Sequence, residues 1–313
     1  MQRKKPEQLA YYEVLIRRSF ETEKYTTLYA KVKSGYLGEL RLDREWKDTN
    51  MNGLLLHDFT CFNAAHHRHQ IDTIFICKHF VLVIEAKNVT GRIDFNPQTR
   101  QLIRQFENGK VEPFTSPIDQ VKRHQALLEH HFLTFPDNVP VEAAVVITNP
   151  NCLIGNTSTE IPMFAVNGLR SIVDELILRH QQVTLNVQQI RDSLKQLYRP
   201  HTAQPWRENV PVRTGVLCLQ CNGKMRATKN GFKCPKCNHF DRNQDALRRT
   251  LHDYRVLNGP SIANQAFRQF AEIESRTTAY EILNRLLPQK KYAGRSSTYF
   301  IPPDISQNPT KII

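Results

Sequence analysis

Residues 81–87, with the sequence Val-Leu-Val-Ile-Glu-Ala-Lys, are the stretch that decides the predicted fold. Side chains alternate along a β-strand, so one face would present Val81, Val83, Glu85 and Lys87, and the other Leu82, Ile84 and Ala86. Both faces begin with apolar residues, which is typical of a central strand that is covered on both sides. We therefore predict a buried strand that ends in a carboxylate and a lysine.

The segments around this strand predict an α/β domain. Helical periodicity extends over residues 7–48, β-rich runs occupy 54–59 and 70–76, a helix begins at Pro117, an apolar strand covers 142–148, and another strand and two helices follow within 161–198. Residues 92–114 resemble a polar hairpin that turns at Asn108-Gly109. The order helix, three strands, helix, strand indicates a mixed sheet.

The charged residues at the end of the central strand suggest metal chemistry. Glu85 and Lys87 would project together, about 7 Å apart along the strand, and buried charges are costly unless they are paired or bind a metal. Asp72 lies among apolar residues of the preceding strand, so antiparallel pairing could bring it beside Glu85. The two carboxylates would suit Mg²⁺ (or Mn²⁺), and Lys87 could orient or deprotonate water for phosphodiester hydrolysis. The alternative is a structural Glu–Lys pair, and the spacing alone favours neither reading.

Four separated motifs extend this pattern. In chain order they are Gly35-Tyr36-Leu37-Gly38-Glu39, His69-Gln70-Ile71-Asp72, Val83-Ile84-Glu85-Ala86-Lys87-Asn88 with Gly91, and Ser116-Pro117-Ile118-Asp119-Gln120 with His124. Together they resemble the nuclease-related domain (NERD) family, which is similar to the PD-(D/E)xK restriction-endonuclease-like superfamily. The resemblance covers roughly residues 30–150 and implies a restriction-endonuclease-like αβββαβ mixed sheet.

The resemblance also implies roles for five residues. Asp72 and Glu85 match the metal carboxylates of the family, and Lys87 matches its catalytic lysine. Glu39 matches the acid on the first helix of resolvase-like members, and Gln120 matches the glutamine of the following helix. The implied catalytic set is therefore Glu39, Asp72, Glu85, Lys87 and Gln120, with Mg²⁺ on Asp72 and Glu85.

Three nearby histidines offer a competing metal site. His66, His67 and His69 crowd a loop before Asp72, and a zinc hydrolase could use such a group. Their spacing does not place three ligands together in any regular element, so we expect a solvated, partly cationic loop that could touch phosphate.

Four cysteines predict a separate metal site. Cys218 and Cys221 form one C-x₂-C pair, and Cys234 and Cys237 form another, with 12 residues between the two pairs. A redox role would need only one pair, whereas two pairs at this separation fit four thiolates around one structural Zn²⁺. We therefore predict a zinc ribbon, whose closed site would fold the module without taking part in catalysis.

The last 70 residues return to helical periodicity. We expect helices over 244–256, from Pro260-Ser261, and over 276–287, where Ser275 would cap the third helix, followed by a basic β-like tail. This order resembles a winged helix-turn-helix. The resemblance implies DNA contacts from Arg276, Thr277, Thr278 and Tyr280, with Asn284 farther along, and backbone contacts from Lys290, Lys291 and Arg295. A helical cap or a protein-docking winged helix remains the alternative.

The charge distribution supports this division. Residues 1–198 contain 24 basic and 22 acidic residues, whereas residues 199–313 contain 19 basic and 8 acidic residues, so most of the net charge of +13 lies in the second part. A basic region beside a nearly neutral one suggests an attached module that binds a polyanion. The predicted boundaries are 1–34 for a helical extension, 35–198 for the nuclease-like domain with its C-terminal helices, 199–214 for a linker, 215–241 for the ribbon and 242–313 for the winged-helix-like module.

The leading hypothesis is a metal-dependent DNA endonuclease that the basic C-terminal modules deliver to DNA. The second is a non-catalytic DNA-binding or regulatory protein that uses the nuclease fold as a scaffold, and the third is an RNA-processing enzyme. The chain shows no signal peptide and no apolar run long enough for a bilayer. We therefore expect a cytoplasmic protein whose partner is DNA and not a membrane, with a homodimer as one option.

Overall fold

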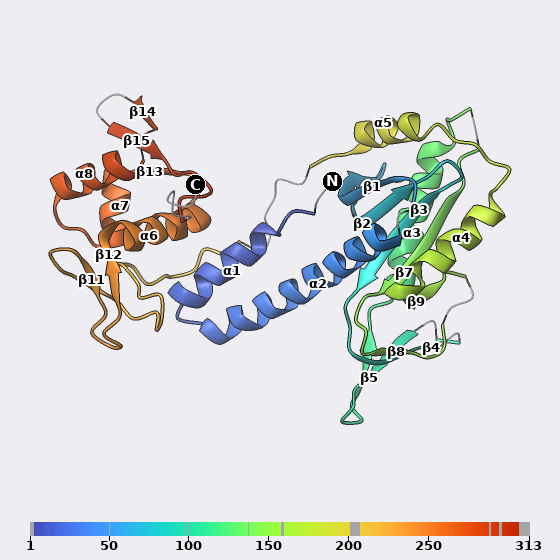
Figure 1. The fold of residues 1–313 in the computed structure, drawn as a ribbon, viewed down its shortest axis with the longest axis horizontal. Helices are drawn as coiled ribbons and strands as arrows, with labels where there is room; N and C mark the ends of the chain where they lie inside the picture. Colours follow the sequence, from blue (N-terminus) through green and yellow to red (C-terminus); the bar gives the residue numbers. More distant parts are fainter. Residues whose placement is uncertain are drawn as a thin grey trace. The chain divides into compact units, whose positions relative to one another are not determined.

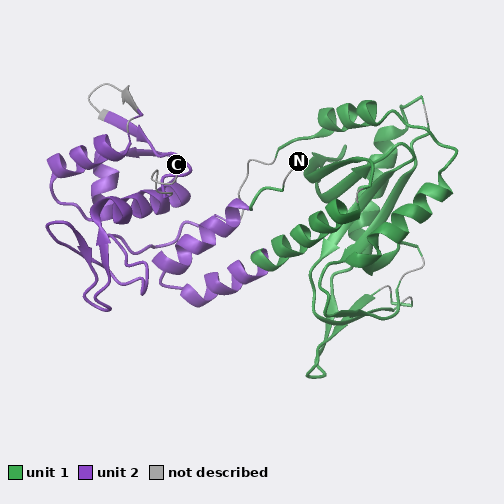
Figure 2. Cartoon of the chain, in the orientation of Figure 1, with its two compact units in different colours: residues 1–5, 33–204 green, residues 6–32, 205–313 purple. Residues whose placement is uncertain are grey.

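The computed structural model describes residues 3–49, 51–96, 98–99, 101–136, 138–157, 160–200, 207–287, 289–293 and 296–306. The chain divides into two units (Figure 2). Unit 1 comprises Met1–Lys5 and Lys33–Gln204, and unit 2 comprises Pro6–Val32 and Pro205–Ile313. Each unit is therefore assembled from segments that are far apart in the sequence.

A five-stranded mixed sheet forms the centre of unit 1. In chain order, the elements of this unit are the second part of α2 (Thr22–Thr49), β1 (Leu54–Phe62), β2 (Arg68–Ile76), β3 (Val81–Lys87), β4 (Gly91–Asn96), β5 (Gln101–Gln105), β6 (Val111–Phe114), α3 (Pro117–Phe132), β7 (Val141–Ile147), β8 (Cys152–Ile154), β9 (Met163–Ala165), a 3-10 turn (Val166–Gly168), α4 (Leu169–Arg179) and α5 (Val187–Leu197) (Figure 1). The strand order is β1-β2-β3-β7-β9. The first three strands are antiparallel, and β7 and β9 continue in parallel from β3. The predicted αβββαβ arrangement is confirmed.

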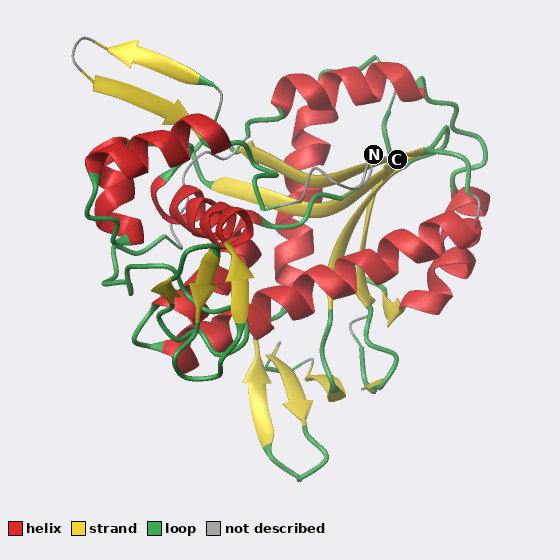
Figure 3. Cartoon of the chain, turned by 60° about the vertical axis from the view of Figure 1, so that its left-hand side comes forward, coloured by secondary structure: helices red, strands yellow, loops and turns green. Residues whose placement is uncertain are grey.

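The strand β3 is buried on both faces, as its sequence predicts. Val81 and Val83 belong to a core that α3 and α5 cover, whereas Leu82 and Ile84 belong to a second core that α2 and α4 cover. In Figure 3 the strands of this sheet accordingly lie between helices. Because its apolar residues are enclosed on both sides, β3 fixes the position of Glu85 and Lys87 at its C-terminal end.

A second sheet, in the order β6-β5-β4-β8, contains the predicted hairpin. The strands β5 and β6 pair in antiparallel fashion, and the turn between them includes Gly109, whose φ of +80° favours glycine. In the same turn the Phe106 and Lys110 backbones are joined by a hydrogen bond of 2.9 Å. The Asn-Gly pair therefore marks the turn where the sequence predicts it.

Unit 2 contains two three-stranded sheets and a group of helices. Its elements are α1 (Glu7–Arg18), the first part of α2, β10 (Arg226–Ala227), β11 (Gly231–Lys233), β12 (Phe240–Arg242), α6 (Asn243–Asn258), β13 (Ser261–Ala263), α7 (Asn264–Ala271), α8 (Arg276–Leu286), β14 (Lys290–Ala293) and β15 (Ser296–Phe300). The sheets have the orders β10-β11-β12 and β13-β15-β14. One hydrophobic core joins Cys218 and Cys234 to Leu247, Phe267 and Leu283, so the cysteine-rich segment and the helices fold around shared side chains.

The structure corrects the predicted start of the second C-terminal helix. Residues 261–263 form the strand β13, and α7 begins only at Asn264. The chain enters β13 through Gly259, whose φ is +99°, and Ile262 pairs with Tyr299 of β15. Three residues are too few to show a strand period, so the sequence pattern favours a helix that begins at Pro260-Ser261.

The helix α1 is attached to α6 by a buried ion pair. Arg18 Nε donates to Asp253 Oδ2 at 2.7 Å, and Arg17 Nη2 donates to Asp253 Oδ1 at 2.6 Å. The end of the segment expected to be a linker also contacts α1 and the residue that follows it, because Arg213 Nη2 donates to the Arg17 carbonyl at 2.6 Å and Val212 forms a β-bridge with Ser19. Among the described residues, no helix has the length and apolar character needed to cross a membrane.

Candidate active site and zinc site

The residues expected to form the active site come from four elements of unit 1. Glu39 lies on α2, Asp72 on β2, Glu85 and Lys87 on β3, and Gln120 on α3. The β2–β3 pairing ends at Thr73 and Ile84, so Asp72 lies opposite Glu85 one step beyond the last pair. There Asp72 Oδ2 accepts a hydrogen bond of 2.9 Å from the Ala86 backbone N–H, which fixes the carboxylate at the end of β3.

Glu85, Lys87 and Gln120 form a connected group. Lys87 Nζ donates to Glu85 Oε1 at 2.5 Å and to Gln120 Oε1 at 3.4 Å. The Glu85 side chain is 2% exposed, whereas that of Lys87 is 26% exposed, so the ammonium lies between a buried carboxylate and solvent. This geometry would let Lys87 act on a molecule that arrives from solution.

The electrostatics of the carboxylates are unfavourable without a cation. Desolvation, reinforced by the charge of Asp72, raises the pKa of Glu85 to about 7, although Lys87 opposes the shift. The same two causes raise the pKa of Glu39 to about 8, although Arg3 opposes that shift. Desolvation also raises the pKa of Asp72 itself. Each negative charge therefore makes the ionisation of its neighbours harder, and a bound cation would reverse the effect.

The donor groups fit a hard divalent cation. Glu85 Oε2 is buried and has no hydrogen-bond partner within the described part of the chain, which leaves one oxygen available on the side chain that resemblance assigns to the metal. Asp72 supplies a second carboxylate next to it. Carboxylate oxygens are the ligands that Mg²⁺ uses, commonly only one or two of them, with water and phosphate completing the shell.

Arg3 is the residue of this site that the sequence did not predict. Its side chain is fully buried, and its Nη1 lies 3.1 Å from Glu39 Oε2. The guanidinium also donates to Asp43 through Nε at 3.1 Å and through Nη2 at 3.2 Å, and to the Asp72 carbonyl at 3.2 Å. No local pattern distinguishes Arg3 from the exposed Lys4 and Lys5, so only the tertiary structure reveals its partners.

The histidine loop does not form a metal site in the structure. Of the residues described, the set with three or more histidine, cysteine or carboxylate ligands close enough to share an ion consists of the four cysteines. His69 instead contacts His124 of α3, with ring centroids 5.4 Å apart. Burial lowers the pKa of both imidazoles, in His124 to about 4, so they are neutral near neutral pH.

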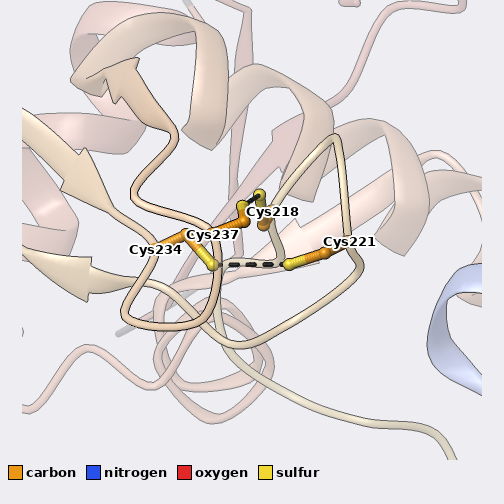
Figure 4. A group of neighbouring side chains, drawn as sticks. All are labelled: Cys218, Cys221, Cys234 and Cys237. Carbon is orange, nitrogen blue, oxygen red and sulfur yellow. Dashed lines mark hydrogen bonds between the residues drawn. The ribbon is translucent and has the colours of Figure 1, made fainter.

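The four cysteines converge as predicted. Their sulfur atoms all lie within 4.8 Å of one another, with Cys218 and Cys237 at 3.6 Å and Cys221 and Cys234 at 3.4 Å (Figure 4). These sulfur–sulfur distances are short enough for all four sulfurs to bind one tetrahedral ion, since Zn–S bonds are about 2.3 Å long. Four thiolates with no position left for substrate fit a structural zinc site.

The two cysteine turns repeat the same local geometry. Each C-x₂-C pair is followed by an asparagine with positive φ, which is 55° at Asn222 and 59° at Asn238. In each turn the asparagine N–H donates at 3.0 Å to the carbonyl of the first cysteine. Asparagine tolerates this left-handed conformation, so it turns each chain segment tightly enough to aim two sulfurs at one point. The matching turns and the sheet β10-β11-β12 identify this segment as a zinc ribbon.

The residues expected to contact DNA lie mostly at the start of α8. Ser275 Oγ accepts from the Thr278 N–H at 3.1 Å, which confirms the predicted helix cap. The side chains of Arg276, Thr277, Thr278 and Tyr280 are all exposed, whereas Asn284 accepts a hydrogen bond from Tyr299. The backbones of Lys290 and Lys291 lie in β14, and Arg295 lies outside the described residues.

Comparison with known proteins identifies the domain that contains the candidate active site. No curated protein and no solved structure matches the chain. Residues 34–148 match the family model of the nuclease-related domain (NERD), and this range includes Glu39, Asp72, Glu85, Lys87 and Gln120. The chain therefore contains a nuclease-related domain in unit 1 and a zinc ribbon in unit 2.

Proposed function

We propose that the protein is a divalent-metal-dependent nuclease that hydrolyses phosphodiester bonds in DNA by endonucleolytic cleavage. The observation that supports this most directly is the buried, unpartnered Oε2 of Glu85, which lies next to Asp72 and on the side chain that Lys87 contacts. A purely structural Glu–Lys pair would not require a second carboxylate whose charge raises the pKa of the first.

The proposed reaction assigns a task to each residue. Asp72 and Glu85 would hold Mg²⁺ or Mn²⁺, which when bound supplies a Lewis acid that polarises a phosphate oxygen. Lys87 would orient the attacking water and offset the charge that develops on the phosphate, since its ammonium is partly exposed at the end of β3. Gln120 would hold Lys87 in position through its Oε1.

Unit 2 would supply DNA binding. Its elements run α6, β13, α7, α8, β14, β15, and its sheet has the order β13-β15-β14, an arrangement that supports the proposal of a winged helix-turn-helix. The exposed start of α8 would then enter the major groove, and β14 and β15 would form the wing. The net positive charge of this part of the sequence supports contact with a polyanion.

A cleavage assay with two matched lysine variants tests the proposed activity. Purified protein would be incubated with single-stranded, duplex and branched DNA, and with RNA, in the presence of Mg²⁺ or Mn²⁺. We expect cleavage of DNA, a loss of about 10²–10⁴-fold in Lys87→Met, and no change in Lys78→Met, whose side chain is exposed away from the site. Asp72→Asn should also inactivate the protein while keeping its hydrogen bond to Ala86.

The same assay separates the nuclease from the alternatives. Undiminished cleavage in both Lys87→Met and Asp72→Asn would refute the assigned active site. DNA binding without cleavage by the wild type would favour a non-catalytic protein that uses the nuclease fold as a scaffold. Faster cleavage of RNA than of any DNA would show that the substrate is RNA and would refute the proposed DNA substrate.

A further inference from the structure

A pocket of about 950 Å³ opens beside the candidate active site in unit 1. Its walls come from Phe62 at the end of β1, the loop over residues 63–67, the start of β2 from Arg68, the side of α3 that contains His124, and Leu197 of α5. This volume lies near the upper end of the usual range for ligand pockets, so it has room for more than an inorganic phosphate.

The chemistry of the walls suits an anion. The pocket is lined by the arginines Arg68 and Arg123 and by five histidines, and the described lining residues include no aspartate or glutamate. No carboxylate that lines the pocket therefore competes with a bound anion for the arginine and histidine side chains. Guanidinium groups that line one space without carboxylates are expected to attract phosphate, and an imidazole N–H can donate a hydrogen bond to it.

A buried imidazole supplies an unused hydrogen-bonding group. His124 is 5% exposed, and its Nδ1 is buried without a hydrogen-bond partner in the described part of the chain. His69, which is 9% exposed, contacts it with its ring edge. A buried polar atom without a partner is costly, so its retention at the wall of a pocket indicates a ligand that completes its hydrogen bonding.

Gln120 belongs both to the pocket and to the candidate active site. This side chain lines the pocket and also accepts from Lys87 Nζ at 3.4 Å. Lys87 therefore contacts a residue of the pocket wall. A DNA strand whose phosphate lies at Lys87 would therefore place its adjoining nucleotide in the pocket.

Part of the pocket lining suits a nucleobase. Phe62 is 38% exposed, and Ala64, Ala65, Leu127 and Leu197 are further apolar residues that line the pocket. Aromatic side chains that are open to solvent stack on unpaired bases, whereas a paired base is already stacked within its duplex. A lining that combines arginines with an exposed ring and apolar side chains fits a single nucleotide.

We propose that this pocket binds an unpaired deoxynucleotide next to the phosphodiester bond that is cleaved, an inference that rests on the proposed nuclease function. Arg123 and His124 bind its phosphate, and Phe62 stacks on its base. The substrate is then a DNA strand with an unpaired segment at the cleavage point, such as a single-stranded overhang, and not an intact duplex.

Photocrosslinking tests the pocket independently of cleavage. A duplex with a single-stranded overhang would have 4-thiothymidine as the first unpaired base, and the matched control would have the same analogue fully paired. The full chain is irradiated with each DNA without added Mg²⁺ or Mn²⁺ and without a chelator, so that the zinc site stays loaded, and crosslinked peptides are identified by mass spectrometry. We expect crosslinks within residues 62–70 or 120–131 for the overhang and much weaker ones for the duplex. Equal crosslinking of the paired control, or crosslinks confined to other segments, would overturn the proposal.

Steady-state kinetics on the overhang substrate supply the second measurement. Arg123→Ala should raise KM about tenfold, which corresponds to about 1.4 kcal/mol, with little change in kcat, because the lost charge-assisted hydrogen bond contributes to binding. Phe62→Ala should reduce the preference for the overhang over the duplex. The control Arg170→Ala removes an exposed arginine from α4, outside the pocket, and should leave both values unchanged. Variants that match this control would overturn the proposal.

The two measurements separate failure of the pocket from failure of the proposed function. Crosslinks in the pocket without cleavage in Mg²⁺ or Mn²⁺ would support the binding site and refute the nuclease. Cleavage without crosslinks in these segments, and with unchanged kinetics in Arg123→Ala and Phe62→Ala, would support the nuclease and refute the pocket. Absence of both crosslinks and cleavage would refute both.

Discussion

Arg3 Nη1 lies 3.1 Å from Glu39 Oε2, so a buried arginine from the start of the chain contacts the first acid of the candidate active site. The positive charge of Arg3 opposes the desolvation that raises the pKa of Glu39 to about 8. Because the same guanidinium also pairs with Asp43 and donates to the Asp72 carbonyl, it holds two acidic side chains of α2 against the middle of β2. Arg3 is thus placed to position Glu39 without itself being a metal ligand.

Replacement of Arg3 should shift the pH dependence of cleavage. In Arg3→Met the pKa of Glu39 rises further, because the opposing positive charge is gone, so Glu39 stays protonated to a higher pH. If ionised Glu39 supports the reaction, the acid limb of the pH–rate profile moves toward higher pH. The control Arg3→Lys keeps the positive charge and should shift the acid limb of the profile less. An unchanged profile in a folded Arg3→Met protein would exclude this role.

Metal affinity should rise steeply with pH. Glu85, with a pKa of about 7, is largely protonated below that value, so a cation must displace its proton. Calorimetric titration with Mn²⁺ should therefore show binding that is about tenfold weaker at roughly pH 6 than at roughly pH 8, and that levels off above about pH 8.

The matched variant for the metal prediction is Glu85→Gln. It removes the titrating group but keeps the size of the side chain, so Mn²⁺ binding should be weak at every pH. Equal Mn²⁺ affinity at both ends of the pH range in the wild type would show that Glu85 is not a ligand.

Loss of zinc should unfold more than the ribbon. The ribbon residues Cys218 and Cys234 pack in one core with Leu247 of α6 and Leu283 of α8. We expect about one Zn²⁺ per chain by elemental analysis. Cys234→Ser should reduce the zinc content and should also increase hydrogen exchange in α6 and α8.

A cysteine outside the zinc site provides the control. Cys152 lies in β8 of unit 1, so Cys152→Ser should leave the zinc content unchanged. Zinc-free native protein, or Cys234→Ser protein with normal exchange in α6 and α8, would contradict the shared-core prediction.

Two basic residues should affect DNA binding in different ways. Arg276→Ala, at the exposed start of α8, should cost about 1–3 kcal/mol of binding free energy if the side chain contacts a base edge. Lys290→Ala should weaken binding to all sequences alike and reduce the slope of log affinity against log salt by about one. Fluorescence anisotropy over a salt series measures both effects, with Arg170→Ala as the control. Wild-type affinity in both variants would exclude α8 and β14 as the DNA-binding surface.

The extent to which the sequence predicts this structure depends on how local each signal is. Residues 81–87 contain apolar side chains on both faces, so the central position of β3 follows from the alternation alone. The C-x₂-C spacing likewise defines the zinc ligands within a few residues. Asp72 and Glu85 could be paired from sequence because adjacent antiparallel strands bring successive segments together.

Other features depend on partners that no local pattern indicates. Arg3 meets Asp43, which lies 40 residues further along the chain, and a single arginine in a basic N-terminal run has nothing to mark it as buried. The strand β13 forms because Ile262 pairs with Tyr299 in β15, far away in the sequence. The pocket beside the active site needs both β2 and α3, so His69 and His124 appear in the sequence motifs without any sign that their rings meet.

The interleaving of the two units limits how the protein can be divided for experiments. A fragment of residues 34–148 would contain the whole family match but would lack Arg3, and would leave Asp43 without its buried partner. A fragment that begins at residue 205 would lack α1, and the buried carboxylate of Asp253 would lose both arginines that, together with the hydrogen bond to His252, hold its pKa at about 2. A single proteolytic cut can therefore not release either unit with all of its own segments.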